Sequence, residues 1–87
     1  MSKSLRTPLQ RQLQDSLAKL RKSKNFTQAD LAQRLGRPQS FVAKYEGGER
    51  LLDVVEFVAV ANALETDPSL LLADLISLSA ANESETD

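Results

Sequence analysis

The 87-residue chain contains no cysteine and no histidine. The absence of cysteine excludes disulfides and thiolate metal sites, and the absence of histidine removes the commonest general base and metal ligand. No apolar run approaches the roughly 20 residues of a membrane span, and the N-terminus has no apolar signal-peptide core. We therefore expect a cytoplasmic protein with no metal site, no cofactor and no contact with a membrane.

Basic side chains are absent beyond position 50. Residues 1–50 carry all 11 basic side chains and 4 acidic ones, a balance of +7, whereas residues 51–87 carry 8 acidic side chains, a balance of −8. The formal net charge of −1 and the pI near 5.4 conceal this asymmetry. The basic half indicates an electrostatic surface for phosphates. The alternative is that its charges are merely solvated helix faces.

A first amphipathic helix is predicted after Thr7-Pro8, a cap followed by a first-turn proline. Its apolar stripe has a leucine every three or four residues: Leu5, Leu9, Leu13, Leu17 and Leu20. This helix should end near residues 23–25. The chain length allows one small domain with one core, and leaves no room for a separate ligand-sensing or protease domain.

Residues 26–48, FTQADLAQRLGRPQSFVAKYEGG, have the pattern of two short helices joined by a glycine turn. Thr27 and Asp30 form a capping pair, because the hydroxyl can accept a hydrogen bond from a first-turn amide and the carboxylate lies near the positive helix end. A helix should therefore begin at Gln28. Gly36 follows the last apolar position and fits the left-handed residue that ends a helix.

The second short helix is predicted from about Pro38 to Glu46, because proline suits a first turn but cannot continue a helix. Val42 and Tyr45 are three apart and should face the core. The remaining side chains should form a mixed polar and small outer surface suited to base edges: Gln39, Ser40, Phe41, Ala43 and Lys44.

Two more helices are predicted in the acidic half. Asp53 is a cap for VVEFVAVANAL, whose valines could indicate a strand. A helix is preferred because the apolar positions keep the helical period without strict alternation: Val54, Phe57, Val58, Ala61 and Leu64. Asp67-Pro68 opens a last helix, expected over 68–78, and the small, acidic residues 79–87 should be a disordered tail. The sequence thus predicts an all-α fold of five helices in one domain, residues 1–78.

The segment Leu17–Leu64 resembles the Cro/repressor-type helix-turn-helix proteins, often called the XRE family. The resemblance rests on Thr27-Gln28, Ala32, Gly36, Val42, Glu46 and Gly48. It implies a lambda-repressor-like domain whose helix-turn-helix motif spans 27–46. Two positions depart from the family pattern. Pro38 replaces a frequent Ser or Thr, which removes a side-chain cap worth about 1 kcal/mol, and Gly47-Gly48 replaces a frequent Asn-Gly, which loosens the turn.

Four side chains of the second motif helix are the predicted base contacts: Gln39, Ser40, Phe41 and Lys44. Glutamine can form two hydrogen bonds to adenine, serine can contact a base or a phosphate, and lysine can reach guanine acceptors or a phosphate. The alternative for Gln39 and Ser40 is that they are ordinary solvent-facing polar residues. Phe41 should either touch a thymine methyl or a sugar, or fold back onto the first helix.

Three phosphate contacts and one structural ion pair are also predicted. Gln28 lies at a helix start, where amides and the helix dipole favour an anion, and by resemblance its side chain contacts phosphate. Arg37 and Arg50 flank the second motif helix and should bind the DNA backbone with little sequence choice. By resemblance, Arg21 and Glu46 form an ion pair that ties the first helix to the third.

These features predict a sequence-specific, DNA-binding transcriptional regulator, a repressor, that binds a twofold-symmetric operator as a homodimer. By resemblance it would block or recruit RNA polymerase, as a cytoplasmic protein associated with the nucleoid. The dimer surface is expected on the last helix, which has more apolar side chains than docking needs: Leu71, Leu72, Leu75 and Ile76. Val55 beside Ala59 offers further apolar surface. A phage repressor, a restriction-modification controller and a host regulator all fit this prediction.

A protein-interaction module, such as an antitoxin or an adaptor, is the alternative function. Salt separates the two, because binding to several phosphates weakens by orders of magnitude between about 50 and 200 mM salt, whereas an apolar protein interface barely responds. An enzyme is not expected. The one catalytic hint is Ser16-x-x-Lys19, a spacing found in some acyl-transfer enzymes, and it lies on a predicted helix with no oxyanion loop.

Overall fold

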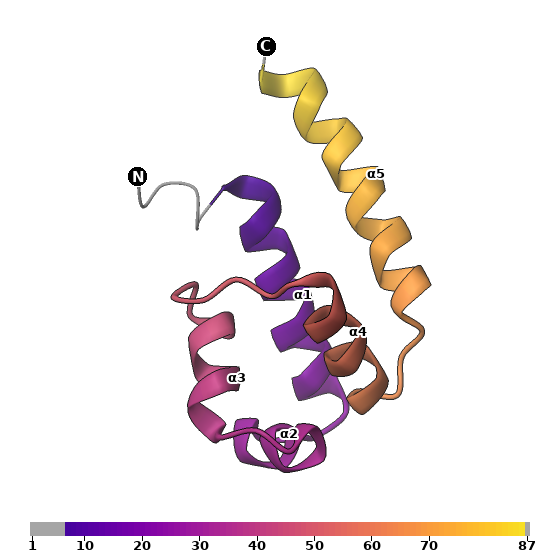
Figure 1. Ribbon diagram of the computed structural model, residues 1–87. Coiled ribbons are helices and arrows are strands. Elements are labelled where there is room, and N and C mark those ends of the chain that lie inside the picture. The colour runs from indigo at the N-terminus through magenta and orange to yellow at the C-terminus, as the bar shows by residue number, and fades with distance from the viewer. Residues whose placement is uncertain (1–6, 87) are drawn as a thin grey trace.

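The computed structural model describes the backbone of residues 7–86 and the side chains of residues 7–79. Within that range the chain forms helices and no strand, which confirms the all-α prediction (Figure 1). The five helices are α1 (Pro8–Ser23), α2 (Gln28–Leu35), α3 (Gln39–Glu46), α4 (Val54–Ala63) and α5 (Pro68–Thr86). Leu5, expected at the start of the first apolar stripe, lies outside the described residues.

Side-chain caps set the starts of α1 and α2. The Thr7 hydroxyl accepts a hydrogen bond from the Gln10 amide at 3.1 Å. Thr27 and Asp30 form a reciprocal capping box, with the Asp30 amide 3.0 Å from the Thr27 hydroxyl and the Thr27 amide 2.9 Å from the Asp30 carboxylate. These bonds satisfy amides that a helix leaves unpaired at its first turn, so the predicted starts of α1 and α2 are confirmed.

The turn between α2 and α3 depends on Gly36 and Pro38. Gly36 has a φ of +68°, and its amide and the following Arg37 amide donate to carbonyls in the last turn of α2. Only glycine adopts this left-handed conformation without steric cost, so the predicted end of α2 is confirmed. Pro38 occupies the N-cap position of α3 and not its first turn, and its side chain makes no capping hydrogen bond. The helix therefore begins at Gln39, one residue later than predicted.

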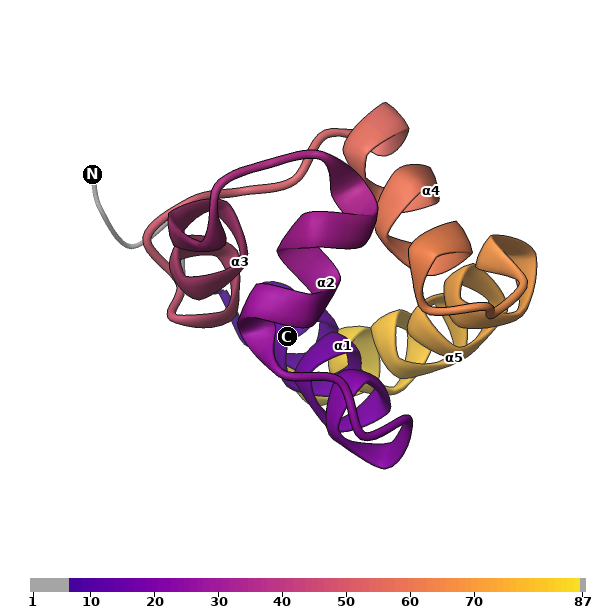
Figure 2. The same ribbon diagram turned by 90° about the horizontal axis from the view of Figure 1, so that it is seen from below.

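The core lies between the first four helices. Its largest fully buried side chains are Leu17, Leu31, Val42, Tyr45, Val60 and Leu64. Figure 2 shows α2 crossing between α3 and α4, and α1·α3, α2·α3 and α2·α4 are packed pairs. Two expectations for α4 are wrong: Val54 and Val58 were placed on the apolar face with Leu64, yet they are 78% and 38% exposed. The buried residues of α4 lie toward its C-terminal end instead, at Val60 and Ala61.

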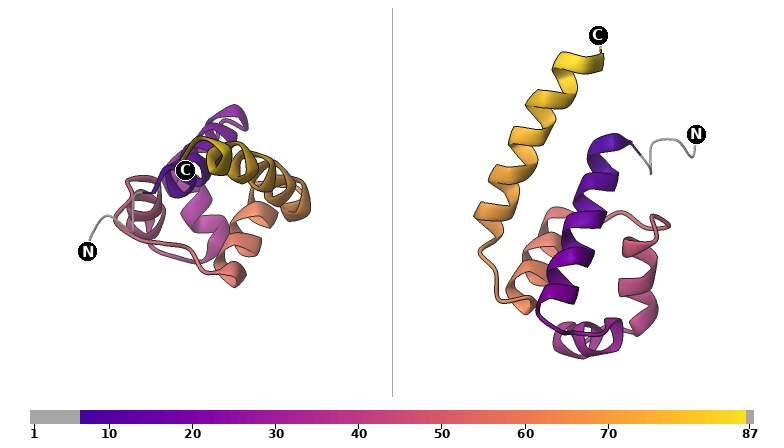
Figure 3. Two further views of the ribbon diagram at one scale, coloured as in Figure 1. Left: turned by 90° about the horizontal axis from the view of Figure 1, so that it is seen from above. Right: turned by 180° about the vertical axis from the view of Figure 1, so that it is seen from behind.

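Helix α5 packs beside α1 and α4 and then extends past them (Figure 3). It continues to Thr86, so the backbone of residues 79–86, expected to be a disordered tail, is helical. Alanine and glutamate are good helix formers and extend a helix that earlier turns have nucleated. None of the described helices is both long and apolar enough to cross a membrane.

Candidate nucleic-acid interface

Helix α3 presents an open outer face at the edge of the molecule (Figure 2). Gln39, Ser40 and Lys44 are exposed on this face. Within residues 7–79, their side chains form no hydrogen bond or ion pair with the rest of the protein. Val42 and Tyr45 face the core as predicted, 0% and 1% exposed. The helix therefore offers free donors and acceptors on one side and is held rigidly on the other.

Phe41 does not belong to this outer face. Its side chain is 7% exposed, and its ring lies edge-on to Tyr45 with the centroids 5.6 Å apart. The phenylalanine follows the same inward stripe as Val42 and Tyr45, because positions i, i+1 and i+4 lie on one side of a helix. Of the two alternatives for Phe41, the outward-facing ring is therefore wrong, and the burial agrees with a side chain that folds back into the protein.

Two arginines cover the Phe41 ring and share one carboxylate. The Arg37 and Arg50 guanidinium carbons lie 4.3 and 4.8 Å from the ring centroid. Glu56 accepts from Arg37 Nη2 at 2.9 Å and from Arg50 Nη1 and Nη2 at 2.8 Å each. We call Arg37, Phe41, Arg50 and Glu56 the arginine cluster. It joins the α2–α3 turn, the start of α3 and the start of α4.

The electrostatics of the arginine cluster follow from these contacts. The Arg50 guanidinium, the Asp53 backbone amide and the Arg37 guanidinium hydrogen-bond to Glu56 and lower the pKa of its carboxyl to about 2. The hydrogen bond to Glu56 likewise raises the pKa of Arg50. Arg50 and Glu56 therefore stay charged at neutral pH, and the Glu56 carboxylate partly offsets the positive charge of the two predicted phosphate-binding arginines.

The predicted ion pair between Arg21 and Glu46 is confirmed. Arg21 Nε lies 2.8 Å from Glu46 Oε2, and Arg21 Nη2 lies 3.0 Å from Glu46 Oε1. Arg21 Nη1 also donates to the Phe26 carbonyl at 2.7 Å. The side chains are only 9% and 8% exposed, and the hydrogen bond to Glu46 raises the pKa of Arg21. The pair fixes the C-terminal end of α3 to α1.

Gln28 is half-buried and belongs to the same network. Its Nε2 donates to Glu46 Oε1 at 3.0 Å. An amide group has two N–H donors, so one hydrogen is committed to Glu46 and the other is available, together with the backbone amide at the start of α2. A phosphate contact through Gln28 stays a prediction, with fewer free donors than the sequence alone indicated.

Comparisons with known proteins agree with this geometry. The sequence model of a helix-turn-helix family matches residues 17–71, more than half of the chain. The solved structure of an XRE-family like protein from Pseudomonas syringae pv. tomato str. DC3000 is 43% identical, with a TM-score of 0.81 over 87% of this chain and 93% of that one. The chain belongs to the XRE family of helix-turn-helix proteins.

A second solved structure shows the same fold at lower identity. It is a Tyr-to-Phe variant of the restriction-modification controller protein C.Esp1396I, 22% identical, with a TM-score of 0.74 over 93% of this chain and 98% of that one. Among curated proteins, the sequence comparison gives no significant match. Membership of the XRE family identifies the chain as a DNA-binding helix-turn-helix domain of the transcription-regulator class.

Glu56 is the functional candidate that the sequence analysis of this XRE-family chain missed. The Asp53-x-x-Glu56 spacing is a capping-box signal, and the structure forms that box at 2.7 and 3.0 Å. This signal could have placed Glu56 at the start of α4. It could not have placed the carboxylate against Arg37, 19 positions earlier in the chain.

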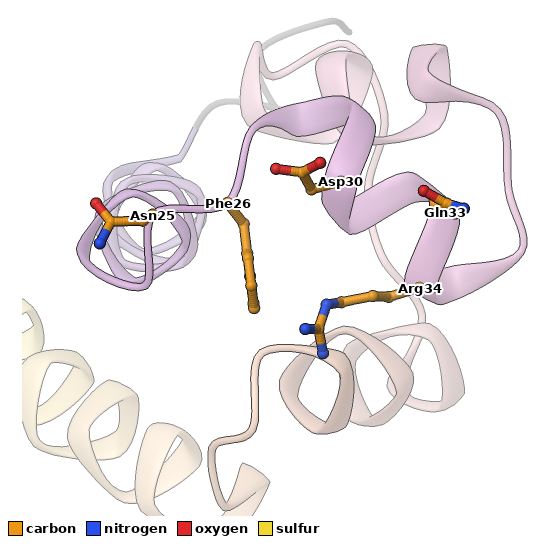
Figure 4. A pocket seen from close by; sticks show the side chains of 5 residues that line it. All are labelled: Asn25, Phe26, Asp30, Gln33 and Arg34. Atoms are coloured by element: carbon orange, nitrogen blue, oxygen red, sulfur yellow. The ribbon is translucent and has the colours of Figure 1, made fainter.

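A second arginine of this XRE-family chain has a similar but separate arrangement. The Arg34 guanidinium lies 4.1 Å from the Phe26 ring centroid and 3.3 Å from the Glu65 carboxylate. Phe26 and Arg34 line a shallow pocket with Asn25, Asp30 and Gln33 (Figure 4). This pocket lies at the α1–α2 turn and along α2, outside α3.

The predicted dimer residues of α5 divide into two pairs. Leu71 and Leu75 are half-buried, and Leu71 packs against the core. Leu72 and Ile76 face outward, with 47% and 61% of their surfaces exposed. Leu72 and Ile76 are therefore the more exposed of the four, and Leu75 lines an apolar groove beside Leu72.

Proposed function

We propose that this protein is a sequence-specific transcription regulator, a repressor, that binds a twofold-symmetric operator as a homodimer. The observation that carries the proposal is the open face of α3, where Gln39, Ser40 and Lys44 are exposed without internal partners among the described residues. Polar side chains of a helix in the major groove distinguish base pairs by their donor and acceptor patterns. The buried side of α3 holds these groups in one orientation.

The two arginines predicted to contact the DNA backbone differ in how many N–H groups they have free. Arg37 gives one Nη2 bond to Glu56, and its side chain is 40% exposed, so most of its N–H groups are free for a phosphate. Arg50 donates to the Leu51 carbonyl and twice to Glu56, which leaves it fewer free N–H donors than Arg37. We expect Arg37 to be the stronger phosphate contact, and Arg50 to act mainly by fixing the cluster.

The homodimer would use the outer face of α5. Leu72 lines an apolar groove with Val54 and Phe57 of α4, and Ile76 extends the exposed row one turn further. A single recognition helix contacts only a few base pairs, whereas two related by a twofold axis contact half-sites about 34 Å apart. Dimerisation would therefore supply the site length that an operator needs.

Selection of bound duplexes from a random DNA pool at about 150 mM salt tests the proposal, because nonspecific attraction is largely screened there. A twofold-symmetric enriched site supports it. Recovery of no enriched sequence contradicts it and favours the protein-interaction alternative. Gln39→Ala and Lys44→Ala should alter base preference, and Gln33→Ala, an exposed glutamine on α2, is the matched control that should not.

Sedimentation tests the dimer separately. Leu72→Glu with Ile76→Glu places charges on the exposed apolar row without touching the half-buried leucines, and should halve the mass at micromolar concentration. Leu70→Glu is the matched control, because Leu70 is 63% exposed on the same helix but lies about 200° around its axis from Leu72. If the double variant keeps the mass of the unmodified protein, the α5 interface is ruled out.

A further inference from the structure

The arginine cluster has no net formal charge once the cap of α4 is included. Arg37 and Arg50 contribute two positive charges, and Glu56 contributes a carboxylate that accepts from both. Asp53 contributes the second negative charge, since its carboxylate accepts the Glu56 backbone amide at 2.7 Å. The corner beside the start of the recognition helix is therefore close to neutral, although it holds two of the 11 basic side chains.

Held arginines and free arginines affect DNA binding differently. A solvated arginine attracts any phosphate, because that attraction depends on charge and counterion release and not on sequence. An arginine held by a carboxylate has fewer donors, and a phosphate must either replace the carboxylate or fit the donors that remain. Arg37 and Arg50 are 40% and 38% exposed, so both can reach a duplex, but only from fixed positions.

The cluster is also attached to the recognition helix. Phe41 lies next to Ser40 in the chain, is buried, and carries both guanidinium groups over its ring. The arginine positions are thereby tied to the position of the exposed base-contacting face. A duplex that aligns its bases with α3 presents its phosphates to the arginines in one register, and other alignments do not.

We propose that Glu56 is a specificity-determining residue, which holds Arg37 and Arg50 against Phe41 and so prevents them from attracting every duplex alike. This inference rests on the proposed function and adds a role for a residue outside α3. Glu56 acts through the arginines and need not touch DNA itself. Its expected effect is to lower affinity for random DNA more than affinity for the operator.

Glu56→Gln separates this role from the cap of α4. Glutamine can still accept the Asp53 amide, since it serves in capping boxes as glutamate does. It loses the charge that holds the arginines. Glu65→Gln is the matched control, because it removes the same charge from the Arg34–Glu65 pair, which also has an arginine over a phenylalanine but lies outside α3.

The experiment measures binding of the full chain to the selected duplex and to a random-sequence duplex of the same length, from about 50 to 200 mM salt. For Glu56→Gln the log–log salt slope on random DNA should steepen by about 0.9 for each additional phosphate that the protein binds, which is about a five-fold tighter affinity per phosphate at 150 mM. The selected duplex should show a smaller increase in affinity, so discrimination should fall. Glu65→Gln should change neither slope nor discrimination.

Two further measurements make the outcomes distinct. In an Arg37→Ala background the effect of Glu56→Gln should shrink, because one of the released arginines is gone. Unchanged slope and discrimination in Glu56→Gln overturn the inference alone, as does a parallel loss of both affinities with a lower melting temperature, which would show a structural role. If the unmodified protein binds no duplex at 50 mM salt, the proposed function itself fails, and this inference with it.

Discussion

Replacement of Arg21 by methionine removes the guanidinium that joins α1 to the α1–α2 turn and to α3. The unmodified side chain makes a two-pronged bond to Glu46, at 2.8 and 3.0 Å, and a third bond to the Phe26 carbonyl. Methionine keeps the length and the apolar stem but has no donor. The Glu46 carboxylate would then be 8% exposed, and among the described residues the Gln28 amide would be its one remaining side-chain partner.

The expected loss of unfolding free energy follows from the burial of Glu46. Removal of one partner of a buried ion pair typically costs 3 to 5 kcal/mol, because the other charge stays desolvated without compensation. Gln28 still donates one hydrogen bond, so we expect the lower end, about 3 kcal/mol. For a domain of this size that corresponds to a fall in melting temperature of about 12 °C or more.

Urea unfolding followed by far-UV circular dichroism at pH 7 measures this change. Arg21→Met with Glu46→Leu should recover most of the loss, because the double variant leaves no unpaired charge in the core. Arg34→Met is the matched control. Its partner Glu65 is 61% exposed, so its loss should cost under about 1 kcal/mol. A loss below about 1 kcal/mol in Arg21→Met, or a double variant as unstable as the single one, would refute the reasoning.

Three further predictions concern stability. Gly36→Ala should cost about 1 to 2 kcal/mol in urea unfolding, from the left-handed φ of +68° alone, because within the described residues no atom beyond its chain neighbours lies within 4 Å of the added Cβ. A much larger loss would indicate a contact that the structure lacks. Phe41→Ala should cost about 3 to 5 kcal/mol in the same assay, and a loss under 1 kcal/mol would contradict its burial. The Glu56 carboxyl has its pKa lowered from 4.5 to about 2, so its stabilisation is complete above about pH 4.5 and is lost as the pH falls toward 2. Melting temperatures of the unmodified protein and Glu56→Gln should therefore converge over that range, and a constant difference would contradict the assigned contacts.

Local features were predictable from the sequence because their partners lie within one turn. Thr27 caps the amide of Asp30 three positions away, and Gly36 ends α2 through its own backbone freedom. The XRE resemblance supplied the Arg21–Glu46 pair, which spans 25 positions and has no local signal. Family knowledge, and not helical periodicity, made that long-range contact predictable.

The burial of individual side chains on α3 and α4 was less predictable from the sequence. Phe41 was assigned to the outer face of α3, although it precedes Val42 by one position and Tyr45 by four and so shares their inward face, where Arg37 and Arg50 cover its ring. Val54 keeps the apolar period of α4, yet the start of α4 projects beyond the core and leaves it exposed. Periodicity specifies which residues share a face, and packing determines how much of that face is covered.

The sequence by itself determined the number and order of the five helices, the caps of α1 and α2, the glycine that ends α2, the charge division at position 50 and the helix-turn-helix motif, because each depends on neighbouring residues or on composition. The tertiary structure alone decided that Glu56 holds Arg37 and Arg50, and that Gln28 is hydrogen-bonded to Glu46. It also decided that Leu71 and Leu75 of α5 are half-buried whereas Leu72 is exposed. These depend on the docking of helices distant in the chain, where burial and carboxylate position set which charges remain free to meet a phosphate.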